Sequence, residues 1–64
     1  MKIVQINQHY YIKIHTNNET IRLYQLYNLA DNLICESYNI NSFILKCNKF
    51  VKLTTHIQRL ITSY

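Results

Sequence analysis

The chain contains neither glycine nor proline among its 64 residues, and this absence constrains every turn that it can make. Glycine ordinarily supplies positive φ, and proline ordinarily fixes the first corner of a turn. Asn, Asp and Ser must serve instead, because their short polar side chains tolerate the left-handed region. The eight asparagines are therefore the expected turn residues.

Codon usage is a second explanation for the many asparagines. Phe, Tyr, Met, Ile, Asn and Lys have A/T-rich codons and make up 32 of the 64 residues. We infer an AT-rich genome, such as that of an organelle (a plastid, for example), a low-GC bacterium or a virus. The six tyrosines fit this bias as well as they fit a role as interface anchors, because tyrosine offers contact area at low entropic cost.

The length of the chain predicts a single domain, residues 1–64, with a marginal core. A domain of this size buries only about 60% of the surface that its unfolded chain exposes, so a partner or a staple is expected. The net charge is +4, with acids only at Glu19, Asp31 and Glu36. Such a surface suits nucleic acid, an anionic membrane or an acidic protein, and it equally suits ordinary solubility.

No stretch is long and apolar enough to span a bilayer, so we expect no transmembrane segment. We also expect no signal peptide, because Met1 leads straight into a short strand-like run. Two cysteines without a secretion signal predict free thiols in a reducing compartment, either intracellular or organellar.

The first half of the chain predicts a β-hairpin followed by a helix. Residues 2–6 ("KIVQI") and 10–15 ("YYIKIH") are rich in β-branched and aromatic residues, and "NQH" separates them, as in a hairpin. Apolar residues then recur at helical spacing after Thr20, a candidate N-cap. We therefore expect a helix over residues 20–31, closed by Asn32 in the left-handed conformation.

The second half predicts two more strands and an ambiguous end. Residues 33–38 ("LICESY") and 42–46 ("SFILK") flank the turn-like "NIN". Residues 49–64 place their apolar side chains on one side of a helical wheel, which favours an amphipathic helix. Their many β-branched residues favour a strand, so both structures stay open for this segment.

The expected order of hairpin, helix and further strands is that of the β-grasp, or ubiquitin-like, fold, an α+β class. The segments "KIVQIN", "YYIKI", "ETIRLYQLYN" and "NLICESYN" resemble the thiamine-pathway sulfur carrier proteins of that fold over residues 2–45. Those carriers end in Gly-Gly, whose carboxylate is adenylated and converted to a thiocarboxylate. This sequence ends in Thr62-Ser63-Tyr64, so the resemblance implies a carrier fold without the carrier chemistry.

No motif in the sequence predicts catalysis, a cofactor or a metal. Cys35 and Cys47 form no CxxC, and the three histidines are scattered, whereas zinc sites show paired ligands at short spacing. The simplest interpretation makes both cysteines small, partly buried apolar residues. A disulfide would need them on neighbouring strands, and a Cys–His nucleophile would need an orienting acid that is not seen nearby. With no glycine, a phosphate-binding loop is absent.

One charged cluster and three tyrosines are the candidate binding surface. The basic residues share one side of the C-terminal wheel, and the tyrosines could stack on bases; the full set is Lys49, Lys52, His56, Arg59, Tyr10, Tyr11 and Tyr24. We expect a non-catalytic protein acting through protein–protein contacts, as an accessory subunit of a larger assembly. The alternatives are an RNA- or DNA-binding module that uses the basic C-terminal face and, third, a sulfur carrier of thiamine biosynthesis.

Overall fold

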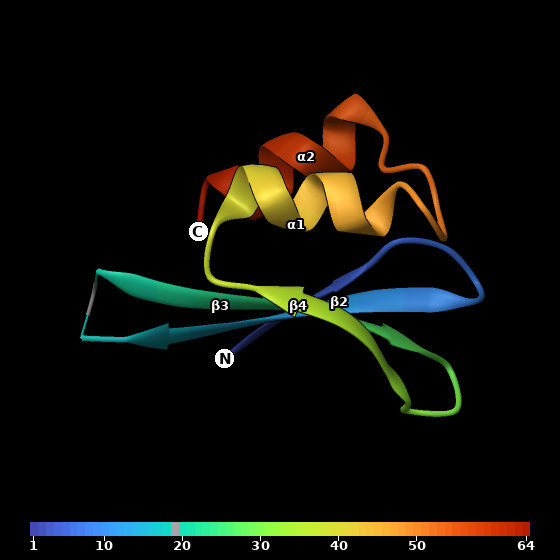
Figure 1. Cartoon of the computed structure of the whole chain (residues 1–64), viewed down its shortest axis with the longest axis horizontal. Coiled ribbons are helices and arrows are strands. Elements are labelled where there is room, and N and C mark those ends of the chain that lie inside the picture. Colours follow the sequence, from blue (N-terminus) through green and yellow to red (C-terminus); the bar gives the residue numbers. More distant parts are fainter. Residues whose placement is uncertain (19) are drawn as a thin grey trace.

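The computed structural model, which describes residues 1–18 and 20–64, is an α+β domain with a four-stranded sheet and two helices (Figure 1). Glu19, one of the three acids of the sequence, lies outside the described residues. The strands are β1 (Lys2–Gln5), β2 (Tyr10–Asn17), β3 (Ile21–Asn28) and β4 (Leu33–Ser37), and the helices are α1 (Ile40–Cys47) and α2 (Thr55–Thr62).

The sheet is antiparallel and its strands follow one another in chain order, β1-β2-β3-β4. The central pair β2–β3 is regular over eight residues, from Tyr10 opposite Asn28 to Asn17 opposite Ile21. Strand β4 pairs only with the second half of β3, from Tyr24 opposite Ser37 to Tyr27 opposite Leu33. The β2–β3 hairpin therefore extends beyond both edge strands (Figure 1).

Asparagine and aspartate make the turns, as the missing glycine predicted. The positive-φ residues of the described chain are Asn18, with φ 55°, and Asp31, with φ 63°. Asn7 Oδ1 accepts hydrogen bonds from the backbone of His9 and Tyr10, at 2.7 and 3.0 Å. Asn32 does not adopt the left-handed conformation predicted for it, because Asp31 takes that place one residue earlier.

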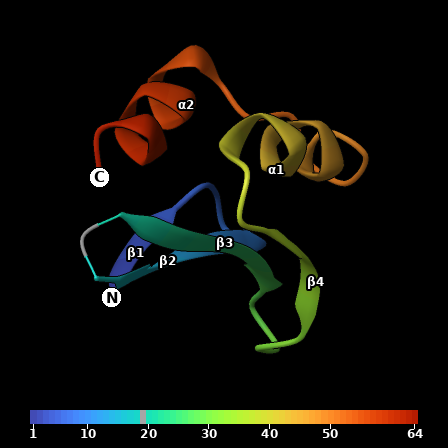
Figure 2. The same ribbon diagram turned by 60° about the vertical axis from the view of Figure 1, so that its left-hand side comes forward.

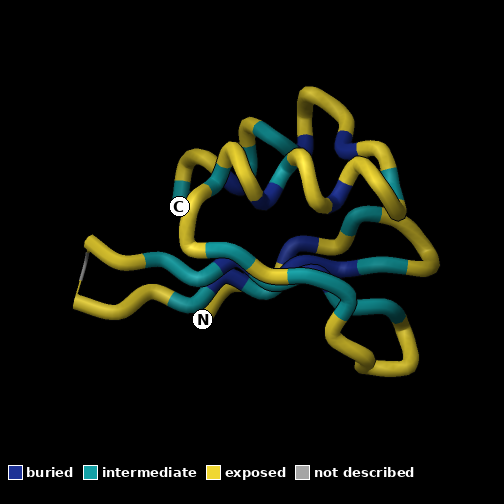
Figure 3. Tube along the Cα trace, in the orientation of Figure 1, coloured by how far each residue is buried: buried dark blue, intermediate teal, exposed yellow. Residues whose placement is uncertain are grey.

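Both helices lie on the same face of the sheet, side by side (Figure 2). Helix α1 contacts β3 and β4, and α2 contacts β1. The core lies between the two layers, as the dark segments of Figure 3 show. It consists of Val4, Ile12, Ile14, Tyr24, Leu26, Phe43, Cys47, Leu53, Ile57 and Ile61.

Capping residues and apolar spacing explain the positions of the helices. Asn39 has an extended backbone, and its side chain accepts a hydrogen bond from Ser42 N at 3.0 Å. Phe43 and Cys47 follow one turn apart, and both are fully buried. Thr54 caps α2 in the same way, by accepting from Ile57 N at 3.2 Å.

Two of the predicted elements are wrong. Residues 21–28, expected as part of a helix over 20–31, form β3, because eight residues pair with β2 on one side and β4 adds bonds on the other. Residues 42–46, expected as a strand, belong to α1, because Asn39 caps them. The predicted hairpin over 2–15 and strand over 33–38 are confirmed. The helical alternative for the C-terminal segment is correct over Thr55–Thr62.

This element order is not the one on which the resemblance to β-grasp carriers was based. That order needs a helix between the second and third strands, whereas β2 ends at Asn17, β3 already begins at Ile21, and both helices follow β4. Among the described residues, no helix is long and apolar enough to cross a membrane.

Candidate functional site: the uncovered sheet face

The helices leave one face of the sheet without a covering layer (Figure 1), which we call the uncovered face. Successive strand side chains alternate between the two faces. Ile12, Ile14, Tyr24 and Leu26 face the helices, so their neighbours along the strands belong to the uncovered face. These neighbours include Tyr11, Lys13, His15, Leu23, Gln25, Tyr27 and Glu36.

A polar network occupies the middle of this face. Gln25 Nε2 donates to Glu36 Oε1 at 2.9 Å, and Gln25 Oε1 lies 2.7 Å from His15 Nε2. With the amide in this orientation, the imidazole donates its Nε2 proton to Gln25. Tyr27 Oη donates to the same oxygen at 3.4 Å. The network links β2, β3 and β4 through their side chains.

Two tyrosines stack beside the network. The rings of Tyr11 and Tyr27, directly opposite each other on β2 and β3, are 5.5 Å apart at an interplanar angle of 11°. Lys13 Nζ lies over the Tyr27 ring, 4.5 Å from its centroid, and 5.9 Å from that of Tyr11. The ring faces are thus partly covered by each other and by the ammonium group, which hinders stacking on a nucleic-acid base.

Tyr11 is additionally held by Asp31. Its hydroxyl donates to Asp31 Oδ1. This hydrogen bond raises the pKa of Tyr11 to about 12, with smaller contributions in the same direction from burial and from the negative charge of the carboxylate. Tyr11 is only 9% exposed although it lies on the uncovered face, because these neighbours surround it.

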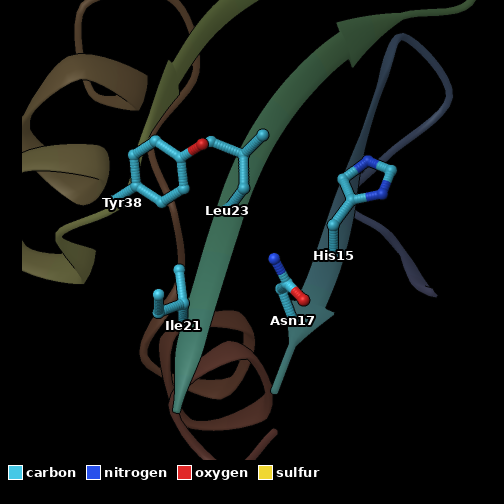
Figure 4. Close-up of a pocket in the computed structure, with 5 residues that line it drawn as sticks. All are labelled: His15, Asn17, Ile21, Leu23 and Tyr38. Atoms are coloured by element: carbon cyan, nitrogen blue, oxygen red, sulfur yellow. The ribbon is translucent and has the colours of Figure 1, made fainter. Parts of the chain in front are cut away.

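An apolar groove of about 550 Å³ lies beyond the network, toward the hairpin tip (Figure 4). It is lined by Ile21 and Leu23 of β3, Tyr38 after β4, and His15 and Asn17 of β2. Ile21 is 49% exposed and Tyr38 69%. A second groove, of about 460 Å³, is lined by Thr20, Arg22, Tyr24, Tyr38, Asn39 and Ile40. Tyr38 borders both grooves.

The predicted binding residues do not gather into one site. Lys49, Lys52, His56 and Arg59 are all exposed on the helix layer. Tyr24 is 5% exposed and packs against Phe43 in the core, with ring centroids 5.6 Å apart. Tyr10 packs against the core as well. Tyr11, on the uncovered face, lies on the opposite side of the sheet from the basic residues.

The residues of the apolar groove were absent from the predicted surface. The alternation of Ile21 and Leu23 with Arg22 and Tyr24 is typical of a strand, and it could have indicated that Ile21 and Leu23 share a face. That signal was obscured because the helical spacing of Leu23, Leu26 and Tyr27 competes with it.

The two cysteines lie next to each other and are protonated. Cys35 on β4 is half-buried and Cys47 on α1 is fully buried. Burial raises the pKa of both thiols. Neither is therefore an activated thiolate at neutral pH. In the described part of the chain, no three His, Cys, Asp or Glu side chains are grouped as they would be around a metal ion.

Comparisons with protein families, with curated proteins and with solved structures found no match to this chain.

Proposed function

We propose that this protein is a non-catalytic subunit that binds another protein through the uncovered face of its sheet. The supporting observation is the apolar groove together with the exposed apolar residues on that face. Ile3, Ile21, Leu33 and Tyr38 are 54%, 49%, 46% and 69% exposed. An antiparallel sheet tolerates water on one face when that face is polar. Apolar side chains beside a polar network are instead typical of an interaction surface.

The size of the domain supports the same proposal. The core of this 64-residue chain lies at a single interface, between the sheet and two eight-residue helices. A partner that binds only the folded state adds stability in proportion to the logarithm of its concentration. An accessory subunit of a larger assembly would gain such stability from the complex.

Nucleic-acid binding is the second candidate, supported by the exposure of the four basic side chains. His56 and Arg59 are one turn apart on α2, on the side away from buried Ile57 and Ile61. Lys49 and Lys52 lie in the exposed connection between the helices. Such a surface would contact phosphates and would carry little sequence information. The tyrosines predicted for this surface do not lie on it, because Tyr11 lies across the sheet and Tyr24 lies in the core; the exposed aromatic beside Lys49 is Phe50, which is 53% exposed.

The test compares an exposed apolar residue of the uncovered face with an exposed apolar residue on the helix layer. Ile21→Asp places a charge in the groove, and Leu45→Asp places one on α1, where Leu45 is 70% exposed. Both variants should fold, as judged by circular dichroism. We expect a partner that co-purifies with the wild type from the native source to be lost from Ile21→Asp and kept by Leu45→Asp. Retention of that partner by both variants would contradict the proposal.

A salt titration separates the two candidates. If Lys49, Lys52 and Arg59 hold phosphates, log affinity for mixed RNA falls with log salt by about 0.7 to 0.9 per contact. Replacing all three by Gln would then weaken every sequence alike. We expect no submicromolar RNA binding at physiological salt. Tight binding that collapses as salt rises would favour the nucleic-acid function instead.

A further inference from the structure

One edge of the sheet is open at the hairpin tip. The pairing of β3 with β4 ends at Tyr24 opposite Ser37, and the chain then leaves the sheet to enter α1. Residues 21–23 of β3 therefore have β2 on one side and no strand of the described chain on the other. This segment is the free edge.

The alternation of hydrogen bonds identifies which groups the free edge offers. In an antiparallel pair, every second residue directs its N–H and C=O to a given neighbour. Leu29 N donates to His9 O, on the β2 side, and Asn28 N donates to Asn32 O, on the β4 side. Even-numbered residues of β3 thus face β4, so the N–H and C=O of Arg22 point outward at the free edge.

The outer edge of β4 is different, because a lysine covers it. Cys35 and Ser37 are paired with β3, so by the same alternation Glu36 directs its main-chain groups outward. Lys46 Nζ donates to Glu36 O at 3.1 Å. Charged side chains on an edge are a recognised barrier to strand addition. The carbonyl of Arg22 has no such side-chain donor among the described residues.

The two grooves lie on opposite faces of the sheet, and both border the free edge. Ile21 and Leu23 line the apolar groove on the uncovered face, whereas Arg22 and Tyr24 line the second groove, on the helix side. A strand added to this edge would direct alternate side chains into the two grooves. The helix-side groove carries one charge among its described lining residues, that of Arg22.

We propose that the free edge of β3 binds an extended segment of the partner protein as an added antiparallel strand, with an acidic side chain opposite Arg22 and apolar side chains on either side of it. This inference rests on the proposed function and states the partner's chemistry. The acidic residue follows from charge complementarity with Arg22, because directly opposite residues share a face and opposite charges there attract. The apolar neighbours follow from Ile21, Leu23 and Tyr38 on the other face.

The probe is a synthetic tripeptide with the one-letter sequence VEV, which matches the three free positions 21–23; it is blocked at both ends and titrated into the full chain. Amide NMR signals of Ile21, Arg22 and Leu23 should shift, and Arg22 N–H should exchange more slowly with solvent. N-methylation of the glutamate removes the N–H that pairs with Arg22 O, and it should weaken binding by about tenfold. N-methylation of the preceding valine, whose N–H points away, is the matched control and should change affinity by less than about twofold.

The charge contact is tested by replacing Arg22 and the peptide glutamate, separately and together, with glutamine. Arg22→Gln should weaken binding of the glutamate peptide. It should leave unchanged the binding of a peptide with glutamine in place of the glutamate, so the comparison isolates the Arg–Glu pair from other contacts. Equal weakening by both N-methylations, or no shift of residues 21–23 with millimolar peptide, would overturn strand addition. If Ile21→Asp still releases the natural partner in that case, the uncovered face remains the proposed interface, and only the proposal of strand addition is refuted.

Discussion

A pair of substitutions on α1 tests whether residues 40–47 are a helix, as the structure shows, or a strand, as the sequence suggests. Phe43 and Leu45 are two residues apart. In a strand they would share one face and one degree of burial. In the helix they lie on opposite sides, and Phe43 is 0% exposed whereas Leu45 is 70% exposed.

The structure gives the size of the expected difference. Phe43→Leu removes about three buried carbons, worth about 2 kcal/mol at roughly 0.8 kcal/mol each. The lost contact with Tyr24 adds about 0.5 to 1.5 kcal/mol. Leu45→Ala removes exposed carbons and should change the free energy of unfolding by less than about 0.5 kcal/mol. At about 0.05 to 0.15 kcal/mol per residue, the 64 residues have a total stability of about 3 to 10 kcal/mol.

Urea denaturation followed by circular dichroism is the appropriate assay, because the leucine variant keeps enough stability to fold. The midpoint should fall strongly for Phe43→Leu and little for Leu45→Ala, with the slope unchanged in both. Equal losses at the two positions would refute the helical assignment and restore a strand. Phe43→Ala should cost more, about 3 to 5 kcal/mol, which exceeds the lower end of this stability range.

Three further predictions concern single side chains. Asn39→Ala removes the cap that accepts from Ser42 N and should cost about 1 kcal/mol in urea denaturation, whereas Asn39→Asp should keep the stability. Asn18→Gly should leave the stability unchanged or raise it by up to about 1 kcal/mol, because glycine adopts positive φ without strain; a clear loss in thermal unfolding would contradict the φ of 55°. The hydrogen bond to Asp31 raises the pKa of Tyr11 from 10.0 to about 12 in the folded state. Its contribution to stability is therefore complete below pH 10 and is lost as pH rises toward 12. The free energy of unfolding of a Tyr11→Phe variant should decline less steeply in this range, and identical declines would exclude the Tyr11–Asp31 linkage.

The sequence predicts the turns and the first hairpin because those features depend on a few neighbouring residues. Without glycine, positive φ had to fall on Asn or Asp, and it does so at Asn18 and Asp31. β3 could not be predicted in the same way. Its apolar residues lie on both faces of the sheet, so the two-residue alternation that is typical of a strand is weak. The same apolar residues also fit the spacing of a helix. The eight pairs with β2 decide the outcome, and they depend on residues outside the segment.

α1 was missed for a local reason. The "NIN" that suggested a turn between strands contains Asn39, the N-cap of the helix. Asparagine serves turns and caps alike, because in both its side chain accepts a backbone N–H. The apolar groove was missed as a consequence, since Ile21 and Leu23 share a face only if residues 21–28 form a strand. The free edge depends on where β4 ends, which tertiary packing decides.

The sheet order has a consequence for the way the chain folds and opens. Each strand pairs with the strand just before it, so the sheet forms through short loops at low entropic cost. The contact of α2 with β1, and that of Lys2 Nζ with the Tyr64 ring at 4.8 Å, join the two ends of the sequence. Closing this long loop should be a late step in folding, with φ-values lower at Ile61 than at Ile12. By the same reasoning α2 is the element that should detach first from the native state, and amide hydrogen exchange would detect this as weaker protection in α2 than in the central hairpin.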